Sequence, residues 1–180
     1  MPIKPVIHGV KTLAQTKLFH VEAVDLEFSN GTQCQFERVN NATDGMVMVI
    51  PILNDELILI REYAVGSEEY ELGFVKGLID PGESPETAAN RELTEEIGFG
   101  STSLKHIRKI RLAPHYNTAV GHIFLATDLY PESSLGDEPE EMEQVRWSLN
   151  DIQSLFDHPQ ISDVRTLYSL FWLQNNLKSI

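Results

Sequence analysis

Hydrophobic and polar residues alternate along residues 18–39, on both sides of Asn30 and Gly31. Alternation with a period of two is typical of a half-buried β-strand, and an Asn-Gly pair readily adopts the positive φ angles of a tight hairpin turn. We therefore expect two antiparallel strands that form a hairpin near the N-terminus.

The middle of the chain predicts mostly strands. Two apolar segments, residues 46–53 and 56–63, are separated by Asn54 and Asp55, so they predict a second hairpin. Three more strands are expected downstream, at residues 106–112, 120–127 and 144–147.

Helical signals occur between these strands and again in the C-terminal tail. Ser84 and Pro85 make a good helix start and Gly98 a good stop, which predicts a helix over residues 85–97. In the tail, apolar residues at helical spacing predict two segments of helix that face the core. Their apolar positions are Leu149, Ile152, Leu155 and Phe156, then Val164, Leu167, Tyr168, Phe171, Trp172 and Leu173.

Composition limits the class of protein. A chain of 180 residues with 42% hydrophobic content fits one domain, or one domain with a small appended element. The formal net charge of -13 argues against nucleic acid as a partner, because phosphate backbones are bound by basic patches. The longest apolar run, residues 46–53, is too short to span a bilayer. We expect no membrane partner and a cytoplasmic location, and the single Cys34 allows no intramolecular disulfide.

Three carboxylates gather on the helix expected at residues 85–97. Glu92, Glu95 and Glu96 have the spacing i, i+3 and i+4, which places them in one patch that borders the core. Two like charges about 4 Å apart repel by roughly 1 kcal/mol in water and about 4 kcal/mol at an effective dielectric near 20. Arg91 can pair with one carboxylate, and a hard divalent cation such as Mg2+ or Mn2+ would neutralise the others. A solvated acidic helix face is the alternative.

The same segment contains a longer pattern, G-x5-E-x7-R-E-U-x-E-E-x-G-U, in which U is apolar. It resembles the Nudix box at every defined position, and a chance match in a chain of this length is on the order of one in 10^7. The matching residues are Gly77, Glu83, Arg91, Glu92, Leu93, Glu95, Glu96, Gly98 and Phe99.

This resemblance implies an α/β chain with the Nudix fold, an α/β/α sandwich with a mixed sheet, over residues 46–180. Residues 1–45 are then an N-terminal antiparallel β-hairpin extension, which pairs two subunits in relatives, so a homodimer is expected. The segments around the box resemble Nudix enzymes that act on ADP compounds. The implied activity is metal-dependent hydrolysis of the diphosphate bond of ADP-ribose, NADH or diadenosine polyphosphates, which gives AMP and the remaining phosphorylated moiety.

The resemblance also implies roles inside the box. Glu92 and Glu96 are the principal ligands of Mg2+ or Mn2+, Glu95 is a further ligand, and a backbone carbonyl at Lys76 or Gly77 is an additional one. Structural support of the box is assigned to Gly77, Glu83 and Arg91.

Two places compete for the general base. Relatives often use a glutamate from a loop outside the box, and the acidic run GDEPEEME at residues 136–143 offers four. Comparison of residues 144–146 with the strand that follows this loop in relatives favours Glu143. Glu95, inside the box, is the competing candidate. The other glutamates of the loop are Glu138, Glu140 and Glu141.

Four residues are candidates for contacts with the substrate. Arg38 occupies the place of a substrate-contacting arginine in the ADP-ribose pyrophosphatases. Arg61 is the second choice, because it stands earlier in its strand than the arginine of those relatives, where this chain has Ala64. Pro114 and Tyr116 follow the box where ADP-ribose pyrophosphatases usually have proline and diadenosine polyphosphate hydrolases tend to have tyrosine. For both arginines, an ordinary surface ion pair is the alternative.

Two other functions fit a chain that resembles this family. A ligand-sensing domain would bind ADP-ribose or NAD without turnover, but such proteins usually lose box carboxylates, and this chain retains them. An isomerase acting on an isoprenoid diphosphate would ordinarily add a catalytic cysteine in a different setting, whereas Cys34 lies far upstream in the expected hairpin.

Overall fold

Seven strands form a mixed sheet in the computed structural model, which describes residues 2–41, 43–136, 139–140 and 142–179. The strand order is β10-β5-β4-β9-β8, with β6 beside β5 and β7 beside β4. β4 and β9 run parallel, whereas the other pairs are antiparallel. The strands are β4 (Met46–Leu53), β5 (Glu56–Ala64), β6 (Glu69–Gly73), β7 (Val75–Leu78), β8 (Phe99–Arg111), β9 (Val120–Pro131) and β10 (Glu143–Ser148).

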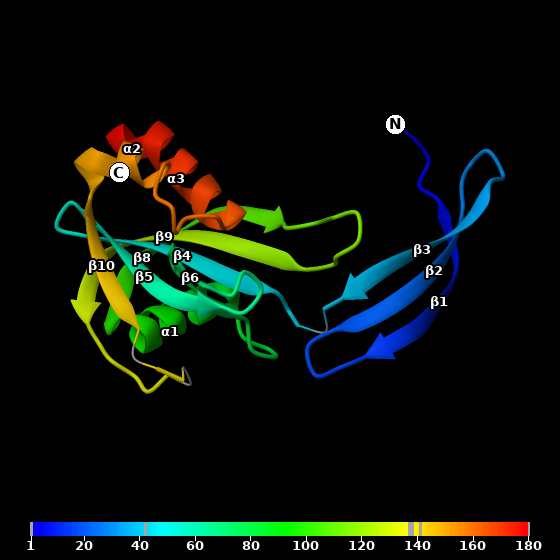
Figure 1. Ribbon diagram of the computed structural model, residues 1–180, viewed down its shortest axis with the longest axis horizontal. Helices are drawn as coiled ribbons and strands as arrows, with labels where there is room; N and C mark the ends of the chain where they lie inside the picture. Colours follow the sequence, from blue (N-terminus) through cyan, green and yellow to red (C-terminus); the bar gives the residue numbers. More distant parts are fainter. Residues whose placement is uncertain (1, 42, 137–138, 141, 180) are drawn as a thin grey trace.

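Helices cover both faces of this sheet (Figure 1). Successive side chains of a strand point to opposite faces, so β4 contributes to two cores. Met48 and Ile50 pack in the core under the C-terminal helices, and Val47 and Val49 pack under the central helix. In the described part of the chain, no helix is long and apolar enough to cross a membrane. The helices are α1 (Pro85–Glu96) on one face, and α2 (Ile152–Leu155) and α3 (Val164–Asn176) on the other, with 3-10 turns at Leu149–Asp151 and Leu177–Ser179.

A second, smaller sheet stands beside the main body (Figure 1). It consists of β1 (Val6–Gln15), β2 (His20–Glu27) and β3 (Gln33–Asn40), paired antiparallel in that order. The expected hairpin is confirmed as β2 and β3, and Gly31 in its turn has a φ of 80°. The expectation of a hairpin alone is wrong, because β1 adds a third strand. Most of the β1 side chains are exposed, so its sequence carries little of the alternation that marks a strand.

The structure also corrects the strands of the main sheet. Asn54 and Asp55 both have positive φ angles, 52° and 63°, as expected for the β4-β5 hairpin. β8 begins at Phe99 instead of near residue 106, directly after the helix. The sequence reading missed β6 and β7, because each is five residues or shorter and contains or ends near a glycine.

α3 faces the core with part of the apolar stripe that its spacing predicts, because Leu173 is buried and Leu167, Tyr168 and Trp172 pack against the core. Val164 and Phe171 were expected in the core, but they are 65% and 59% exposed. The buried residues of α3 lie at i, i+3, i+4 and i+7, and two of them are small polar residues that a search for apolar positions passes over. They are Thr166, Ser169, Leu170 and Leu173.

Candidate metal and diphosphate site

The helix that carries the three glutamates begins and ends close to where the sequence predicts. The Ser84 hydroxyl accepts a hydrogen bond from the backbone N–H of Thr87 (3.1 Å), and Pro85 is the first helical residue. At the other end, Gly98 has a φ of 74°, a left-handed conformation that stops a helix. The apolar side of α1 is held in the core, which fixes the direction of its glutamates. The buried residues of that side include Ala89, Leu93 and Ile97.

Arg91 ties the start of the box to the helix. Its Nε donates to Oε1 of Glu83 (3.2 Å) and its Nη2 to Oε2 (3.1 Å), while Nη2 also reaches the Leu78 carbonyl (2.9 Å). Its Nη1 donates to Glu92 (2.7 Å) and to Glu95 (2.9 Å). The bonds from Arg91 lower the pKa of Glu83, so that carboxylate stays charged. One guanidinium therefore holds three carboxylates and the loop before α1 in place.

Glu92 and Glu96 are almost completely buried, with exposed fractions of 8% and 7%. Oε2 of Glu96 accepts a hydrogen bond from the backbone N–H of Lys76 (3.2 Å). The pKa of Glu96 is raised to about 9, chiefly by burial; the Lys76 charge opposes the shift and the Glu92 charge contributes to it. When no divalent metal ion is bound, Glu96 is therefore mostly protonated at neutral pH.

Gly77 permits the close approach of β7 to the glutamates. A Cβ built on Gly77 would lie 1.9 Å from Oε1 of Glu92, so any side chain here would displace that carboxylate. Two buried carboxylates and the carbonyls of β7 are oxygen ligands of the kind that Mg2+ and Mn2+ prefer. Among the described residues, no three His, Cys, Asp or Glu side chains already form a complete metal site. A cation at Glu92 and Glu96 would therefore also need backbone or substrate oxygens.

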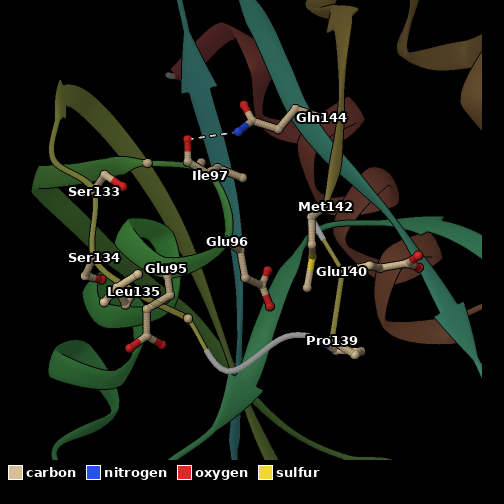
Figure 2. Close-up of a pocket in the computed structure, with 12 residues that line it drawn as sticks. Glu95, Glu96, Ile97, Ser133, Ser134, Leu135, Pro139, Glu140, Met142 and Gln144 are labelled. Carbon is tan, nitrogen blue, oxygen red and sulfur yellow. Dashed lines mark hydrogen bonds between the residues drawn. The ribbon is translucent and has the colours of Figure 1, made fainter.

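Glu95 and Glu96 line a cavity of about 550 Å³ beyond the end of α1 (Figure 2). Residues 133–136 line one side of it, and the Ser134 hydroxyl lies 2.7 Å from that of Thr94. Glu140 lines the other side, but its carboxylate points away from Glu96 in Figure 2. That carboxylate accepts a hydrogen bond from the Tyr70 hydroxyl (2.9 Å).

Glu143 and Arg61, which were both predicted as site residues, form an ion pair with each other. Glu143 lies opposite Arg61 in the pairing of β10 with β5, and their side chains form an ion pair. Nε of Arg61 also donates to Gln160 (3.1 Å). The candidate base Glu143 and the candidate substrate contact Arg61 are thus adjacent. Of the remaining loop candidates, Glu138 and Glu141 lie outside the described residues.

Arg38, Pro114 and Tyr116 come together in a different cavity, of about 660 Å³. It lies between the N-terminal sheet and the segment after β8, which are joined by the bond from the Val39 N–H to the Tyr116 carbonyl (2.7 Å). Nε of Arg38 donates to Oε2 of Glu22 (2.8 Å). Arg38 therefore forms an ordinary ion pair, which is the alternative to a substrate contact for this arginine. Two cavities lie beside α1: the one of about 550 Å³ lined by Glu95 and Glu96, and a second one of about 470 Å³ lined by Glu92. Among the described residues, none lines both the Arg38 cavity and either of these two.

The sequence reading missed three side chains that surround Glu92. A cavity of about 470 Å³ is lined by Glu92 and Gly77 together with Lys76, Glu62 and Arg165. The ammonium of Lys76 forms an ion pair with Glu62. Lys76 stands directly before the box and could have been noticed there, but no local pattern marks Arg165, which is brought in by the packing of α3.

Comparison with known proteins identifies relatives of both parts of the chain. The NUDIX domain profile matches residues 44–166, and the profile of the NudE-type Nudix hydrolase N-terminal domain matches residues 5–38. The ADP compounds hydrolase NudE of Escherichia coli is 52% identical over 175 residues, covering 97% of this chain and 94% of the relative. The ADP-ribose pyrophosphatase of Bacillus subtilis is 28% identical over 172 residues, covering 91% of this chain and 92% of the relative.

A solved structure described as the crystal structure of ADP compounds hydrolase has the same fold. Its TM-score is 0.93 at 50% sequence identity, over 99% of this chain and 97% of that chain. The expected Nudix fold, with a mixed sheet between helices, is thereby confirmed for the main body, and the N-terminal extension is corrected to a three-stranded sheet.

The raised pKa of Glu96 predicts how stability depends on pH when divalent cations are absent. The folded protein keeps a proton on Glu96 up to about pH 9, whereas the unfolded chain releases it near the ordinary value of 4.5. The folded state thus binds more protons between these values, and the free energy of unfolding should fall as the pH rises through this window. Urea unfolding in the presence of a chelator, repeated across the window, measures the slope.

Two variants serve as controls for that slope. Glu96→Gln cannot titrate at this position and should show a flatter profile, whereas Glu86→Gln, at an exposed position of the same helix, should keep the wild-type slope. A wild-type profile as flat as that of Glu96→Gln would contradict the prediction.

Proposed function

This chain belongs to the Nudix hydrolase family, and we propose that it hydrolyses the diphosphate bond of ADP compounds. The products are AMP and the remaining phosphorylated moiety, and the proposed substrates are ADP-ribose, NADH and diadenosine polyphosphates. The similarity to the Escherichia coli ADP compounds hydrolase over nearly the full length supports this substrate class. The observation that carries the proposal is the buried pair Glu92 and Glu96, whose carboxylates lie beside the backbone of β7.

Glu92 and Glu96 are the proposed holders of Mg2+ or Mn2+, with the backbone carbonyl of Lys76 or Gly77 as an additional ligand. Glu95 is the proposed further ligand, although Arg91 contacts it here. A bound divalent cation would neutralise phosphate oxygens and lower the pKa of an attacking water. The residues themselves supply the fixed geometry, because the buried side of α1 and the absence of a side chain at Gly77 keep the oxygen atoms close together.

Arg91 and Glu83 have a positioning role in this proposal. Their paired bonds hold the loop before α1 against the helix, so the backbone at Gly77 stays beside Glu92. Arg91 also limits the repulsion among the box carboxylates, since its Nη1 reaches two of them.

We expect the purified chain to release AMP from ADP-ribose in the presence of Mg2+ and to lose this activity with excess chelator. Glu96→Gln removes a proposed metal ligand and should lower kcat by roughly 10^2- to 10^4-fold, the usual range for loss of a central catalytic group. Chromatographic detection of AMP measures both effects.

Glu86→Gln is the matched control, because it removes an exposed carboxylate from the same helix, and it should retain wild-type turnover. Full activity of Glu96→Gln would contradict the metal assignment. A folded wild-type chain that binds ADP-ribose without releasing AMP would instead favour a ligand-sensing function.

The general base is proposed to come from the loop at residues 136–143, with Glu143 as first choice. Glu143→Gln should then lower kcat by about 10^2- to 10^4-fold while the affinity for ADP-ribose survives, because a base acts on the water and not on substrate binding. Glu140→Gln, Glu141→Gln and Glu138→Gln test the other three candidates of this loop.

Glu95→Gln separates the box candidate from the loop candidates in the same assay. Near-normal kcat values for all four loop variants would reject the loop assignment and leave Glu95 as the base.

Arg38, Pro114 and Tyr116 are proposed as substrate contacts away from the metal, and Arg61 is proposed as a second contact beside Glu143. The cavity lined by Arg38, Pro114 and Tyr116 combines a cation with aromatic rings, the two kinds of group that hold a nucleotide. An Arg38→Ala variant with an unchanged KM would reject its assignment.

We also propose that the N-terminal extension, residues 1–45, pairs two copies of residues 46–180 into a homodimer. Large apolar side chains of its sheet are exposed, which is typical of an interaction surface. Val10 lies in register with Val24 and Phe36 across the three strands, so the apolar positions form a row across the sheet. The exposed apolar residues of the whole sheet include Val6, Ile7, Val10, Leu13 and Phe36.

Light scattering at micromolar concentration should therefore give twice the chain mass of 20.3 kDa. Val10→Glu places a charge in the apolar row and should shift the mass toward the monomer. Val65→Glu, at a position that is 83% exposed outside this sheet, should leave the mass unchanged. A wild-type mass of one chain would exclude the homodimer.

A further inference from the structure

The cavity of about 470 Å³ beside Glu92 is lined by cationic side chains as well as by carboxylates. Its wall includes three carboxylates, of Glu62, Asp80 and Glu92, and three cations. Two of the cations are already bound to carboxylates of the same region, since Lys76 pairs with Glu62, and Arg91 pairs with the box glutamates. The third cation, Arg165, pairs with Asp163, which does not line this cavity.

Arg165 reaches this cavity from the first turn of α3. Asp163 is the N-cap of that helix, and its carboxylate accepts bonds from the backbone N–H of Arg165 (2.8 Å) and from Nε (2.8 and 2.9 Å). Nη2 of Arg165 binds the same carboxylate. These bonds fix the plane of the guanidinium, and its side chain is only 21% exposed.

The remaining nitrogen of Arg165 has a weak partner. Nη1 donates to the thioether sulfur of Met46 (2.9 Å), and thioethers are poor acceptors. A phosphate oxygen could replace that sulfur at little cost, and a guanidinium suits phosphate oxygens in charge and geometry. Lys76 is less suited to this exchange, because its ammonium would have to leave the carboxylate of Glu62.

We propose that Arg165 binds the diphosphate of the substrate through Nη1, in the cavity where Glu92 would hold the cation. The inference rests on the proposed function, because it requires the diphosphate to enter this cavity. Three carboxylates and three cations make the wall of the cavity formally neutral, and a divalent cation held at Glu92 and Glu96 would add positive charge that attracts a diphosphate. Arg165 is then a specificity residue for the diphosphate and takes no part in the chemical step.

Binding of an ADP-ribose analogue with a methylene bridge between its phosphorus atoms tests this role without turnover. In calorimetry with Mg2+, Arg165→Gln should weaken binding by roughly 10- to 100-fold, the usual effect of losing a charged hydrogen-bonding partner. Hydrolysis of ADP-ribose should show a raised KM with kcat changed only slightly, because the contact exists before and during the reaction. Arg165→Lys should recover part of the affinity.

Two further variants separate ligand binding from support of the fold. Asp163→Asn keeps an N-cap oxygen but breaks the ion pair, so its affinity should stay within about threefold of wild type or improve. Arg108→Gln removes an exposed arginine of β8 and should change nothing. Thermal unfolding of each variant reports any loss of stability separately.

Three results would overturn the inference. Wild-type affinity in Arg165→Gln would show that Arg165 does not bind the diphosphate. Equal losses of affinity in Asp163→Asn and Arg165→Gln would show that the ion pair between these residues supports the local fold, and that Arg165 does not bind the diphosphate directly. If the wild-type chain neither binds the analogue nor hydrolyses ADP-ribose, the proposed function itself fails, and the role of Arg165 fails with it.

Discussion

Two carboxylates, those of Glu92 and Glu96, are held out of water beside a hydrophobic core, and the rest of the site is arranged around this costly placement. Removing a charged group from water is unfavourable unless a partner compensates. Here burial keeps Glu96 protonated at neutral pH, and Arg91 donates a hydrogen bond to Glu92. A divalent cation is the partner that suits two such oxygen ligands.

The fold maintains this placement by packing and not by the glutamates themselves. The apolar side of α1 lies under β4, so the helix cannot rotate to carry its carboxylates into solvent. β7 passes directly over Glu92 because Gly77 has no side chain. On the opposite face of the sheet, α3 carries Arg165 to the edge of the same cavity. Both layers of the sandwich therefore contribute to one site.

Local signals in the sequence were sufficient for the box and for its helix. Ser84, Pro85 and Gly98 act within a few residues of where they stand, so their effect on α1 could be predicted. The pairing of Glu143 with Arg61 could not, because it depends on the register of β10 against β5. Arg165 is likewise distant in sequence from the box. β1 was missed because a strand exposed along most of its length has no hydrophobic period to detect.

The central claim is that Glu92 and Glu96 bind a divalent cation, and Mn2+ binding followed by electron paramagnetic resonance tests it most directly. The free-ion signal should decrease when wild-type chain or Glu86→Gln is added, because bound Mn2+ no longer contributes to it. Glu92→Gln and Glu96→Gln should each require at least roughly 10-fold more Mn2+ for the same occupancy, as expected when a ligand is lost. Equal Mn2+ binding by wild type and both variants would contradict the account.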